Sequence, residues 1–400
     1  MPTLQDVQAA RELLLGVARV TPLEGSRPLS ERVGGPVHLK CENLQRAGSF
    51  KIRGAYTRIA GLSAEERARG VVAASAGNHA QGVALAASLL GCTATVFMPE
   101  EAPIPKVAAT RAYGAEVRFS GHTIDVALDA ARAYAEQTGA VLIHPFDHAD
   151  VVAGQGTVGL EILEQCPEVR TIVVCTGGGG LIAGIALAVK ALRPEVVVVG
   201  AQAEGAASYA ASLAAGHPVR LEKMATMADG IAVGQPGEVP FALVRQHVDR
   251  IVTVSEASLS RALLLALERA KLVVEPAGVA GMAAVLDDPS AFEPPVVVVL
   301  SGGNIDPLLL LRVLRYGMTA AGRYLSLRVR IPDKPGNLAV LLAAVGGSGA
   351  NVVEVEHMRT EPGIAVDEVE VALQLETQGP EHTAEVVVHL QALGYALRTT

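Results

Sequence analysis

Apolar, β-branched runs alternate with stretches rich in Ala and Leu through most of the chain. Three such pairs are GVVAAS (70–75) with AQGVALAASLLG (80–91), ATVFMP (94–99) with PKVAATRAYG (105–114), and TIVVCT (171–176) with LIAGIALAVKAL (181–192). VVVVGAQ (196–202) and PVVVVLSGG (295–303) are two further apolar runs. Because these runs are continuous rather than alternating, they predict strands that are covered on both faces, which is typical of a parallel α/β sheet.

The pattern changes near residue 320. GMTAAGRY (317–324) is small and polar and predicts a linker. An alternating strand from Tyr324, a turn at Asp333–Gly336, a helix from Asn337 and a strand near Asn351 follow. A third strand (366–377), a helix (380–392) and a short last strand complete the order βαββαβ, which is typical of a ferredoxin-like unit. Alternation with charged residues predicts one sheet face that is wet or paired with another copy.

Composition narrows the class of protein. Half of the 400 residues are hydrophobic and 18% are charged, so the chain is expected to fold into globular domains. The net charge is -8 and no basic cluster stands out, which argues against nucleic acid or an anionic membrane as partner. The four Cys lie far apart, so we expect buried thiols in the cytoplasm, with neither a disulfide framework nor a zinc site.

Two segments need a check for targeting or membrane insertion. The first twenty residues have no basic region before an apolar core, so they predict an amphipathic helix and not a signal peptide. Residues 171–189 are uncharged and nearly long enough to span a bilayer. Four consecutive glycines break that segment into a strand, a turn and a helix, so we expect it in a buried α/β core.

Three polar or glycine-rich turns each follow a predicted strand. They are SAGNH (75–79), GGGG (177–180) and SGGN (301–304). Ligands of open α/β sheets bind at the carboxyl ends of the strands. We therefore expect these turns to meet at one crevice.

The tetraglycine turn can be a phosphate site or only a tight connection from strand to helix, and taken alone it would favour the second. Without Cβ atoms its backbone N–H groups can approach an anion, and the following helix adds the positive end of its dipole. No Gly-Lys-Ser/Thr follows, so it is not a Walker A loop. Gly178, Gly180 and Ala183 also match G-x-G-x-x-A, with Glu204 near the place of a ribose-binding acid, so a dinucleotide site stays open as an alternative.

The stretch GSFKIRGAY (48–56) contains the candidate reactive lysine. Ser49 is expected to cap a helix that puts Lys51 in its first turn. The helix dipole, the nearby Arg53 and burial beside Phe50 should all lower the pKa of the amine, and a neutral amine is what a Schiff base needs. Lys40, in a predicted strand, is the rival lysine.

A phosphate cradle and a tuned lysine together predict pyridoxal phosphate as the cofactor. Asn78 can then hydrogen-bond the phenolic oxygen of the ring, and Ser301 can meet the pyridine nitrogen. Ser75 and the N–H groups of its turn can hold a substrate carboxylate. His79 belongs to the same turn, although local packing and hydrogen bonding is its more ordinary role.

SFKIRGA, SAGNHAQG, GGGGLIAG and SGGNID, in this order, resemble the pyridoxal-phosphate-dependent threonine dehydratases (threonine ammonia-lyases) of the tryptophan-synthase-β-like fold, fold type II. The resemblance runs over roughly residues 5 to 320. IPDKPGNL and GANVVEVEH resemble an ACT domain, a module that binds amino acids. The resemblance implies a two-lobed catalytic domain over 1–320, with a smaller lobe at about 43–147, and an ACT regulatory domain over 325–400.

The resemblance also implies the site. Lys51 would carry the cofactor, Phe50 would lie beside its ring, and Asn78 and Ser301 would keep the roles given above. The phosphate would be held by Gly177, Gly178, Gly179, Gly180 and Leu181, and the substrate by Ser75, Ala76, Gly77, Asn78 and His79. The implied reaction is α,β-elimination of water from L-threonine to give 2-oxobutyrate and ammonia, with L-serine as a second substrate.

Two departures from relatives carry expectations. Ala76 stands where serine racemases of this fold have a proton-donating Ser, so we expect dehydration without racemisation. Gln202 and Ser208 stand where some relatives bind a divalent cation with carboxylates, and Glu204 is only a partial substitute. We therefore expect no obligatory divalent metal, while a monovalent cation stays open.

Several alternatives remain at this point. Within the same fold they are a serine dehydratase, a threonine synthase and a cysteine synthase. Outside it they are an NAD-dependent dehydrogenase and a non-catalytic amino-acid sensor. The ACT resemblance implies a homo-oligomer, a tetramer or a dimer, with effector contacts at Asp333, Gly336, Asn337, Leu338 and Asn351. The enzyme could serve isoleucine biosynthesis or threonine catabolism, and the sequence does not choose between them. The ACT unit could bind an effector or could only build the oligomer, and this also stays open.

Overall fold

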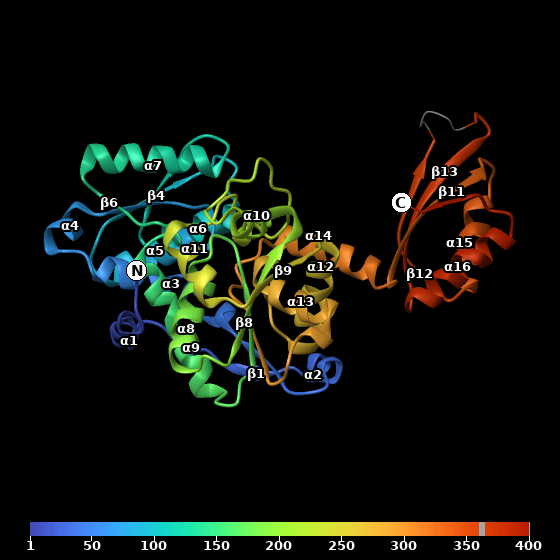
Figure 1. Ribbon diagram of the computed structural model, residues 1–400. Coiled ribbons are helices and arrows are strands. Elements are labelled where there is room, and N and C mark those ends of the chain that lie inside the picture. The colour runs from blue at the N-terminus through green and yellow to red at the C-terminus, as the bar shows by residue number, and fades with distance from the viewer. Residues whose placement is uncertain (360–364, 400) are drawn as a thin grey trace. The chain divides into compact units, whose positions relative to one another are not determined.

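Two β-sheets and their helices make up the N-terminal unit of the computed structural model, Met1–Leu310, and a third sheet lies in the C-terminal unit, Leu311–Thr400 (Figure 1). The structure describes residues 1–359 and 365–399. The N-terminal unit has the parallel α/β architecture that its continuous apolar runs predict, and the C-terminal unit has the βαββαβ order that its alternating strands predict.

The larger sheet has the strand order β1-β2-β10-β7-β8-β9 and is parallel except for β1. Its strands are β1 (Leu23–Gly25), β2 (Val37–Lys40), β7 (Thr171–Cys175), β8 (Val197–Ala203), β9 (Arg250–Val254) and β10 (Val296–Val299). Every residue of β7 and β10 is buried. The reason is that helices cover both faces of the sheet (Figure 1). One face is covered by α8 (Ala149–Gln165) and α9 (Gly180–Leu192), and the other by α12 (Glu256–Leu265) and α13 (Ala280–Asp287).

The helices of this part of the chain are α1 (Leu4–Leu13), α2 (Arg27–Val33), α8 (Ala149–Gln165), α9 (Gly180–Leu192), α10 (Ser208–Ala215), α11 (Glu238–His247), α12 (Glu256–Leu265) and α13 (Ala280–Asp287). Helix α14 (Pro307–Ala320) begins here and continues into the C-terminal unit. Among the described residues, none of the helices combines the length and the apolar character needed to cross a bilayer.

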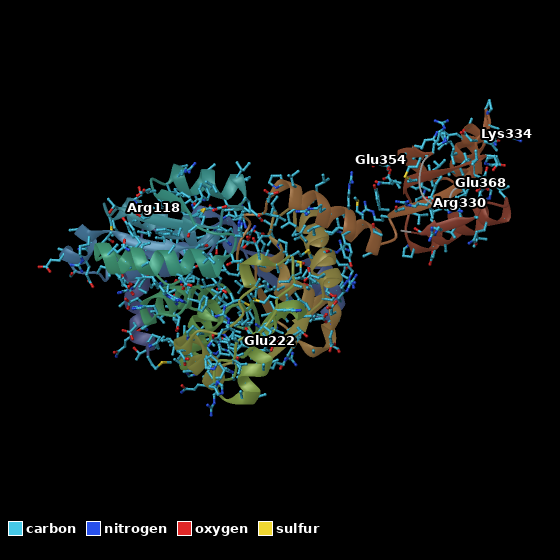
Figure 2. All side chains as sticks on the ribbon, turned by 90° about the horizontal axis from the view of Figure 1, so that it is seen from above. Arg118, Glu222, Arg330, Lys334, Glu354 and Glu368 are labelled. Atoms are coloured by element: carbon cyan, nitrogen blue, oxygen red, sulfur yellow. The ribbon has the colours of Figure 1, made fainter. Side chains whose placement is uncertain are left out.

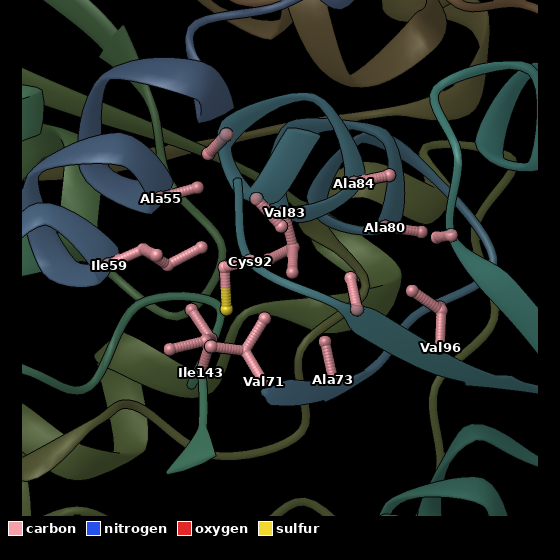
Figure 3. Close-up of a cluster of buried hydrophobic side chains, with 14 of the residues drawn as sticks. Ala55, Ile59, Val71, Ala73, Ala80, Val83, Ala84, Cys92, Val96 and Ile143 are labelled. Atoms are coloured by element: carbon pink, nitrogen blue, oxygen red, sulfur yellow. The ribbon is translucent and has the colours of Figure 1, made fainter. Parts of the chain in front are cut away.

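The smaller sheet is parallel, with the order β5-β4-β3-β6. Its elements are β3 (Val71–Ala74), β4 (Ala94–Met98), β5 (Glu116–Phe119) and β6 (Val141–Leu142), with α3 (Lys51–Ala60), α4 (Ala64–Arg69), α5 (Asn78–Leu89), α6 (Ile104–Ala112) and α7 (Ile124–Thr138). Small residues let these elements approach closely. Ala80, Val83 and Ala84 of α5 pack with Ala55 and Ile59 of α3 in one buried cluster (Figure 3).

The strand orders place two of the candidate turns at switch points. β7 lies between β8 and β10, and β3 lies between β4 and β6. In each sheet the next strand along the chain is therefore added on one side of the central strand, and a later strand is added on its other side. Helices on opposite faces leave a crevice at such a point. The tetraglycine follows β7, and SAGNH follows β3.

The C-terminal unit has the element order β11 (Tyr324–Pro332), α15 (Asn337–Gly347), β12 (Asn351–Met358), β13 (Glu368–Glu376), α16 (Pro380–Ala392) and β14 (Leu397–Thr399). Its antiparallel sheet has the order β12-β13-β11-β14. Buried residues alternate along β11 and pack with Leu341 and Leu390 of the two helices. Charged side chains lie at the other positions: Arg328 pairs with Glu370 at 2.9 Å, and Figure 2 shows Arg330 and Glu368 on this unit.

The predicted linker over 317–324 is wrong in most of its length. Helix α14 continues through Ala320, and β11 begins at Tyr324, so only residues 321–323 connect them. The small and polar character of the stretch suggests a linker. Ala and Met are nevertheless good helix formers, and here they extend an existing helix.

Candidate active site

A cavity of about 1000 Å³ lies in the N-terminal unit where the loops after β3, β6, β7 and β10 meet. The structure brings all the candidate cofactor and substrate residues to its wall. They are Phe50, Lys51, Ser75, Ala76, Gly77, Asn78, His79, Gly177, Gly178, Gly179, Gly180, Leu181 and Ser301. Residues that lie far apart in sequence thus share one cavity, as parallel strand ends predict.

Lys51 is the first residue of α3, and its Nζ donates to the carbonyl oxygen of Pro145 at 2.9 Å. Burial lowers the pKa of this amine to about 8. The nitrogen lies 5.0 Å from the centroid of the Phe50 ring. The environment of the amine therefore favours the direction expected from the sequence, with desolvation as the main cause.

Two expectations about this helix are wrong. Ser49 is not its cap: the N-cap residue is Phe50, without a side-chain hydrogen bond, and the buried Ser49 Oγ has no partner among the described residues. Arg53 does not face Lys51. Its guanidinium instead binds both oxygens of Glu42 at 2.8 Å and reaches Glu161 at 2.6 Å.

Lys40 joins that buried network and does not line the cavity. Its Nζ donates to Glu161 at 2.5 Å and to the carbonyl oxygen of Thr21 at 2.9 Å. Two cations and two carboxylates therefore neutralise one another behind α3. Burial opposes ionisation of Glu42, but the attraction of Arg53 outweighs it and keeps the pKa of that carboxyl below its usual range. The rival lysine has a structural partner, and Lys51 alone of the two faces the cavity.

The tetraglycine turn has no room for side chains. A Cβ on Gly178 would lie 2.5 Å from the Phe146 ring, and one on Gly179 would lie 1.8 Å from the Tyr209 hydroxyl. Gly179 has a φ of +96° and precedes Gly180, the first residue of α9. The turn therefore presents bare backbone and a helix N-terminus to the cavity, which suits an anion.

The turn after β3 is held by its own side chains. Ser75 Oγ accepts from the N–H of Gly77 at 3.1 Å, and Asn78 begins α5. His79 is buried, and its Nε2 lies 2.7 Å from the carbonyl oxygen of Ile143. Burial and the nearby Lys51 lower the pKa of His79 to about 3. The imidazole is thus neutral and engaged locally, although the residue also borders the cavity.

The turn after β10 is tied to the lysine loop. The carbonyl oxygen of Ser301 accepts from the N–H of Phe50 at 3.1 Å, and Ser49 pairs with Gly302 in an isolated bridge. The Ser301 side chain is buried, and its interaction with the thiol of Cys175 partly offsets the rise that burial causes in the pKa of that thiol. The last glycine of SAGNHAQG completes the arrangement, because a Cβ on Gly82 would lie 3.1 Å from Lys51.

Sequence reasoning missed a buried acid in the cavity wall. Glu275 accepts from Asn78 Nδ2 at 2.6 Å, and burial together with the nearby Asp229 raises its pKa to about 7. Asp229 also pairs with Lys106 at 2.6 Å across the cavity. A signal was present for Glu275, since it is a lone acid within the apolar stretch LVVEPAGVAG.

In the stretch around Gln202, the one considered for a divalent cation, the side-chain amide of Gln202 is bonded to backbone groups. Gln202 Nε2 donates to the carbonyl oxygens of Thr176 at 3.2 Å and Ala206 at 3.4 Å, and its Oε1 accepts from the Tyr209 N–H at 3.1 Å. Glu204 is exposed and away from the cavity. In the described part of the chain, His, Cys, Asp and Glu form no group of three or more that could hold a metal ion.

The candidate effector residues do not form one cluster within a chain. Asp333, Gly336, Asn337 and Leu338 lie at the turn from β11 to α15. Asn351 follows the other end of α15, which spans 11 residues or about 16 Å. Asp333 is ion-paired with Arg359 at 3.1 Å, which lowers its pKa.

Comparison with known proteins identifies the family. The family described as pyridoxal-phosphate dependent enzyme matches residues 14–302. The chain belongs to this family. The resemblance drawn from the four motifs is thereby confirmed, and the dinucleotide alternative loses its support, since Glu204 is not at the cavity.

Relatives within the family are similar along most or all of the chain. An L-threonine ammonia-lyase of Thermotoga maritima is 48% identical over 398 residues, 100% of this chain and 99% of that protein. A solved threonine deaminase from T.th. is 45% identical, with a TM-score of 0.73 over 76% of this chain and 99% of that one. A maize serine racemase reaches a TM-score of 0.75 at 38% identity, covering 78% of this chain and 96% of its own.

The residues present fit the family's cofactor. Lys51 supplies an amine that burial keeps partly neutral near pH 8. The tetraglycine supplies an anion cradle in which no Cβ could be placed. Asn78 and Ser301 supply polar atoms on the same cavity wall as these two groups.

Proposed function

We propose that the protein is an L-threonine ammonia-lyase, which converts L-threonine to 2-oxobutyrate and ammonia. The observation that carries the proposal is the lysine of lowered pKa in the same cavity as a bare glycine cradle. Full-length similarity to an L-threonine ammonia-lyase supports the substrate.

We assign the cofactor contacts as follows. Lys51 would hold pyridoxal phosphate covalently, with Phe50 beside the ring. Gly177, Gly178, Gly179, Gly180 and Leu181 would hold its phosphate through backbone N–H groups. Asn78 would donate to its phenolic oxygen and Ser301 would meet its pyridine nitrogen. When bound, the cofactor supplies an electron sink for the negative charge that develops at the substrate Cα.

The chain's own residues do the binding and the proton transfer. The turn of Ser75, Ala76 and Gly77 holds the substrate carboxylate, with His79 fixing the start of α5 behind it. Lys51 Nζ takes the proton from Cα, which requires its neutral form. The Cβ–O bond breaks and the departing oxygen takes up one proton, which balances the proton that Lys51 removed from Cα, so that it leaves as water. Hydrolysis of the enamine product then consumes one water, so L-threonine yields one 2-oxobutyrate and one ammonia.

The first test is turnover with one substrate. Holoenzyme and L-threonine alone should release 2-oxobutyrate and ammonia in equal amounts, with L-serine as a second substrate that gives pyruvate. A threonine synthase or a cysteine synthase would need a phosphorylated or a second substrate. Such an enzyme would therefore release no product when free L-threonine is the only substrate. Chiral analysis of remaining serine completes the test. Ala76 has no proton to donate, so D-serine should not accumulate.

We propose a division of labour between two domains. Residues 1–320 would form the catalytic domain, with a smaller lobe at about 43–147, and residues 325–400 an ACT regulatory domain. The βαββαβ order and the sheet order of the C-terminal unit support this. Since Asn351 and the Asp333–Leu338 turn lie at opposite ends of α15, an effector that touches both would bind between two copies, in a dimer or tetramer.

Two further points belong to the proposal. The four cysteines are buried free thiols, which supports a reducing, cytoplasmic location. No divalent ion is needed, because the Gln202 amide already satisfies the carbonyl oxygens of Thr176 and Ala206. Activity should therefore be unchanged by a divalent-ion chelator.

A further inference from the structure

A chain of side-chain amides joins the three loops around the cavity. Asn304, at the end of SGGN, donates from Nδ2 to the carbonyl oxygen of Ala47 at 2.7 Å and to Asn78 Oδ1 at 2.8 Å. Asn78 in turn donates from Nδ2 to Glu275 Oε1 at 2.6 Å. Asn78 and Glu275 line the cavity, and Asn304 lies behind them.

The direction of this chain follows from its first acceptor. The two ends of an asparagine amide are similar in size, so hydrogen-bond partners decide which end is nitrogen. A backbone carbonyl such as that of Ala47 can only accept, so Asn304 must turn its NH₂ group toward it. The same nitrogen also faces the side chain of Asn78, so Asn78 must accept this hydrogen bond through its Oδ1. The NH₂ group of Asn78 is then left on the side of Glu275.

The turn that supplies the carbonyl is shaped around Asn304. Ala47 has a φ of +57°, a left-handed conformation that is strained for a non-glycine residue. Gly48 follows with a φ of +68°, and a Cβ there would lie 2.2 Å from Asn304 Oδ1. A strained residue and a required glycine thus both serve the contact with this one amide.

Glu275, which accepts from the nitrogen of Asn78, is also held closely by its neighbours. Its N–H donates to the carbonyl oxygen of Gly302 at 3.0 Å, and a Cβ on Gly302 would lie 2.4 Å from Glu275 Oε1. SGGN therefore fixes both neighbours of Asn78: Asn304 on the oxygen side and, through Gly302, Glu275 on the nitrogen side.

We propose that Asn304 and Glu275 are positioning residues that lock the Asn78 amide so that it offers an N–H, and not a carbonyl oxygen, to the phenolic oxygen of the cofactor. The inference rests on the proposed function. The Asn78 nitrogen has two hydrogens, and Glu275 takes one, so the second is available to the cavity. Without the lock the amide can rotate, and an oxygen would then face an oxygen.

A cofactor analogue isolates this effect. Wild type and Asn304→Ala are each titrated with pyridoxal phosphate and with the analogue that lacks the phenolic oxygen, and binding is followed by fluorescence. Asn304→Ala should weaken pyridoxal phosphate about three- to tenfold, the range of one hydrogen bond. Binding of the analogue should be unchanged. The matched control is Asn43→Ala, since Asn43 Nδ2 also donates to a backbone carbonyl, that of Val273 at 3.1 Å, without touching Asn78.

Two variants of Glu275 keep the inference testable if Asn304→Ala fails to fold. Glu275→Gln keeps an oxygen for Asn78 and should retain the preference for pyridoxal phosphate over the analogue, whereas Glu275→Leu should lose it. Equal weakening of both ligands by Asn304→Ala, or full preference in Glu275→Leu, would overturn the inference. A wild-type protein that makes 2-oxobutyrate but does not distinguish the two ligands would overturn it as well. Absence of 2-oxobutyrate would instead count against the proposed function.

Discussion

At the scale of single residues, contacts between distant parts of the chain build the cavity wall and the ionic network behind it. Lys51, Asn78 and the tetraglycine stand in short motifs whose chemistry is local, and the structure brings them to one cavity. The neighbourhood of Arg53 does not follow from the local sequence, because its two partners, Glu42 and Glu161, lie 11 and 108 positions away. Glu275 meets Asn78 across 197 positions, and no local pattern announces such a contact.

The lowered pKa of Lys51 predicts a pH dependence of cofactor binding. The neutral amine reacts, and its fraction rises with pH through the pKa of about 8. The rate at which apoenzyme combines with pyridoxal phosphate should therefore rise with pH and reach half its maximum near pH 8. In Glu275→Gln the half-point should move to lower pH, because the carboxylate helps to keep the amine charged. Stopped-flow absorbance measures both, and a half-point near pH 10 in the wild type would contradict the burial of this amine.

Gly179 provides a steric test of the phosphate cradle. Gly179→Ala places a methyl 1.8 Å from the Tyr209 hydroxyl in a backbone of positive φ, so it should lower stability by about 1–3 kcal/mol beyond the backbone strain and weaken cofactor binding. Gly216→Ala is the control, since Gly216 has a φ of +77° with open space around it. Urea unfolding and cofactor titration compare the two. Equal effects would mean that strain alone matters.

At the scale of elements, the long apolar strands and their helices are predictable from periodicity. β7 and β10 are buried over their whole length, and for this reason every residue in their central runs is apolar or small enough to be recognised as part of a buried strand. β5 is largely exposed, and β6 has two residues, so neither has a pattern to read. The start of α3 is not predictable from its own residues, because tertiary bonds to the SGGN loop, and not a serine cap, fix it.

The buried ionic network anchors α3, which carries Lys51, to α8. Arg53→Met should cost about 3–5 kcal/mol of unfolding free energy, because Glu42 and Glu161 would then share only Lys40. Arg11→Met is the matched control: Arg11 also pairs with a glutamate of α8, Glu164, but in the solvent, where a pair is worth about 0.2–1 kcal/mol. Chemical denaturation gives both values. A loss of less than about 1 kcal/mol for Arg53→Met would refute the anchoring role.

At the scale of the whole molecule, the sequence predicts two kinds of unit, and the structure has two. Their chemistry differs as expected: glycine-rich turns and a lysine in the first, a charged antiparallel sheet in the second. What the second unit binds does not follow from its fold, because function is carried by sites and not by architecture.

Regulation is testable on the intact enzyme. If L-isoleucine is the effector of the C-terminal unit and binds at paired copies that are linked to the catalytic site, release of 2-oxobutyrate from L-threonine should fall sigmoidally as L-isoleucine is added. Light scattering before and after addition tests whether copies of the chain associate. Activity that is indifferent to L-isoleucine would exclude feedback by this amino acid and favour a catabolic role.

The central claim is that Lys51 carries the cofactor in the cavity at the two switch points. Reduction of the holoenzyme with borohydride, followed by peptide mapping, tests it most directly. The account predicts that the added cofactor mass is found on the peptide that contains Lys51 and is absent from the peptide that contains Lys40. Label on Lys40, or on no lysine, would contradict it.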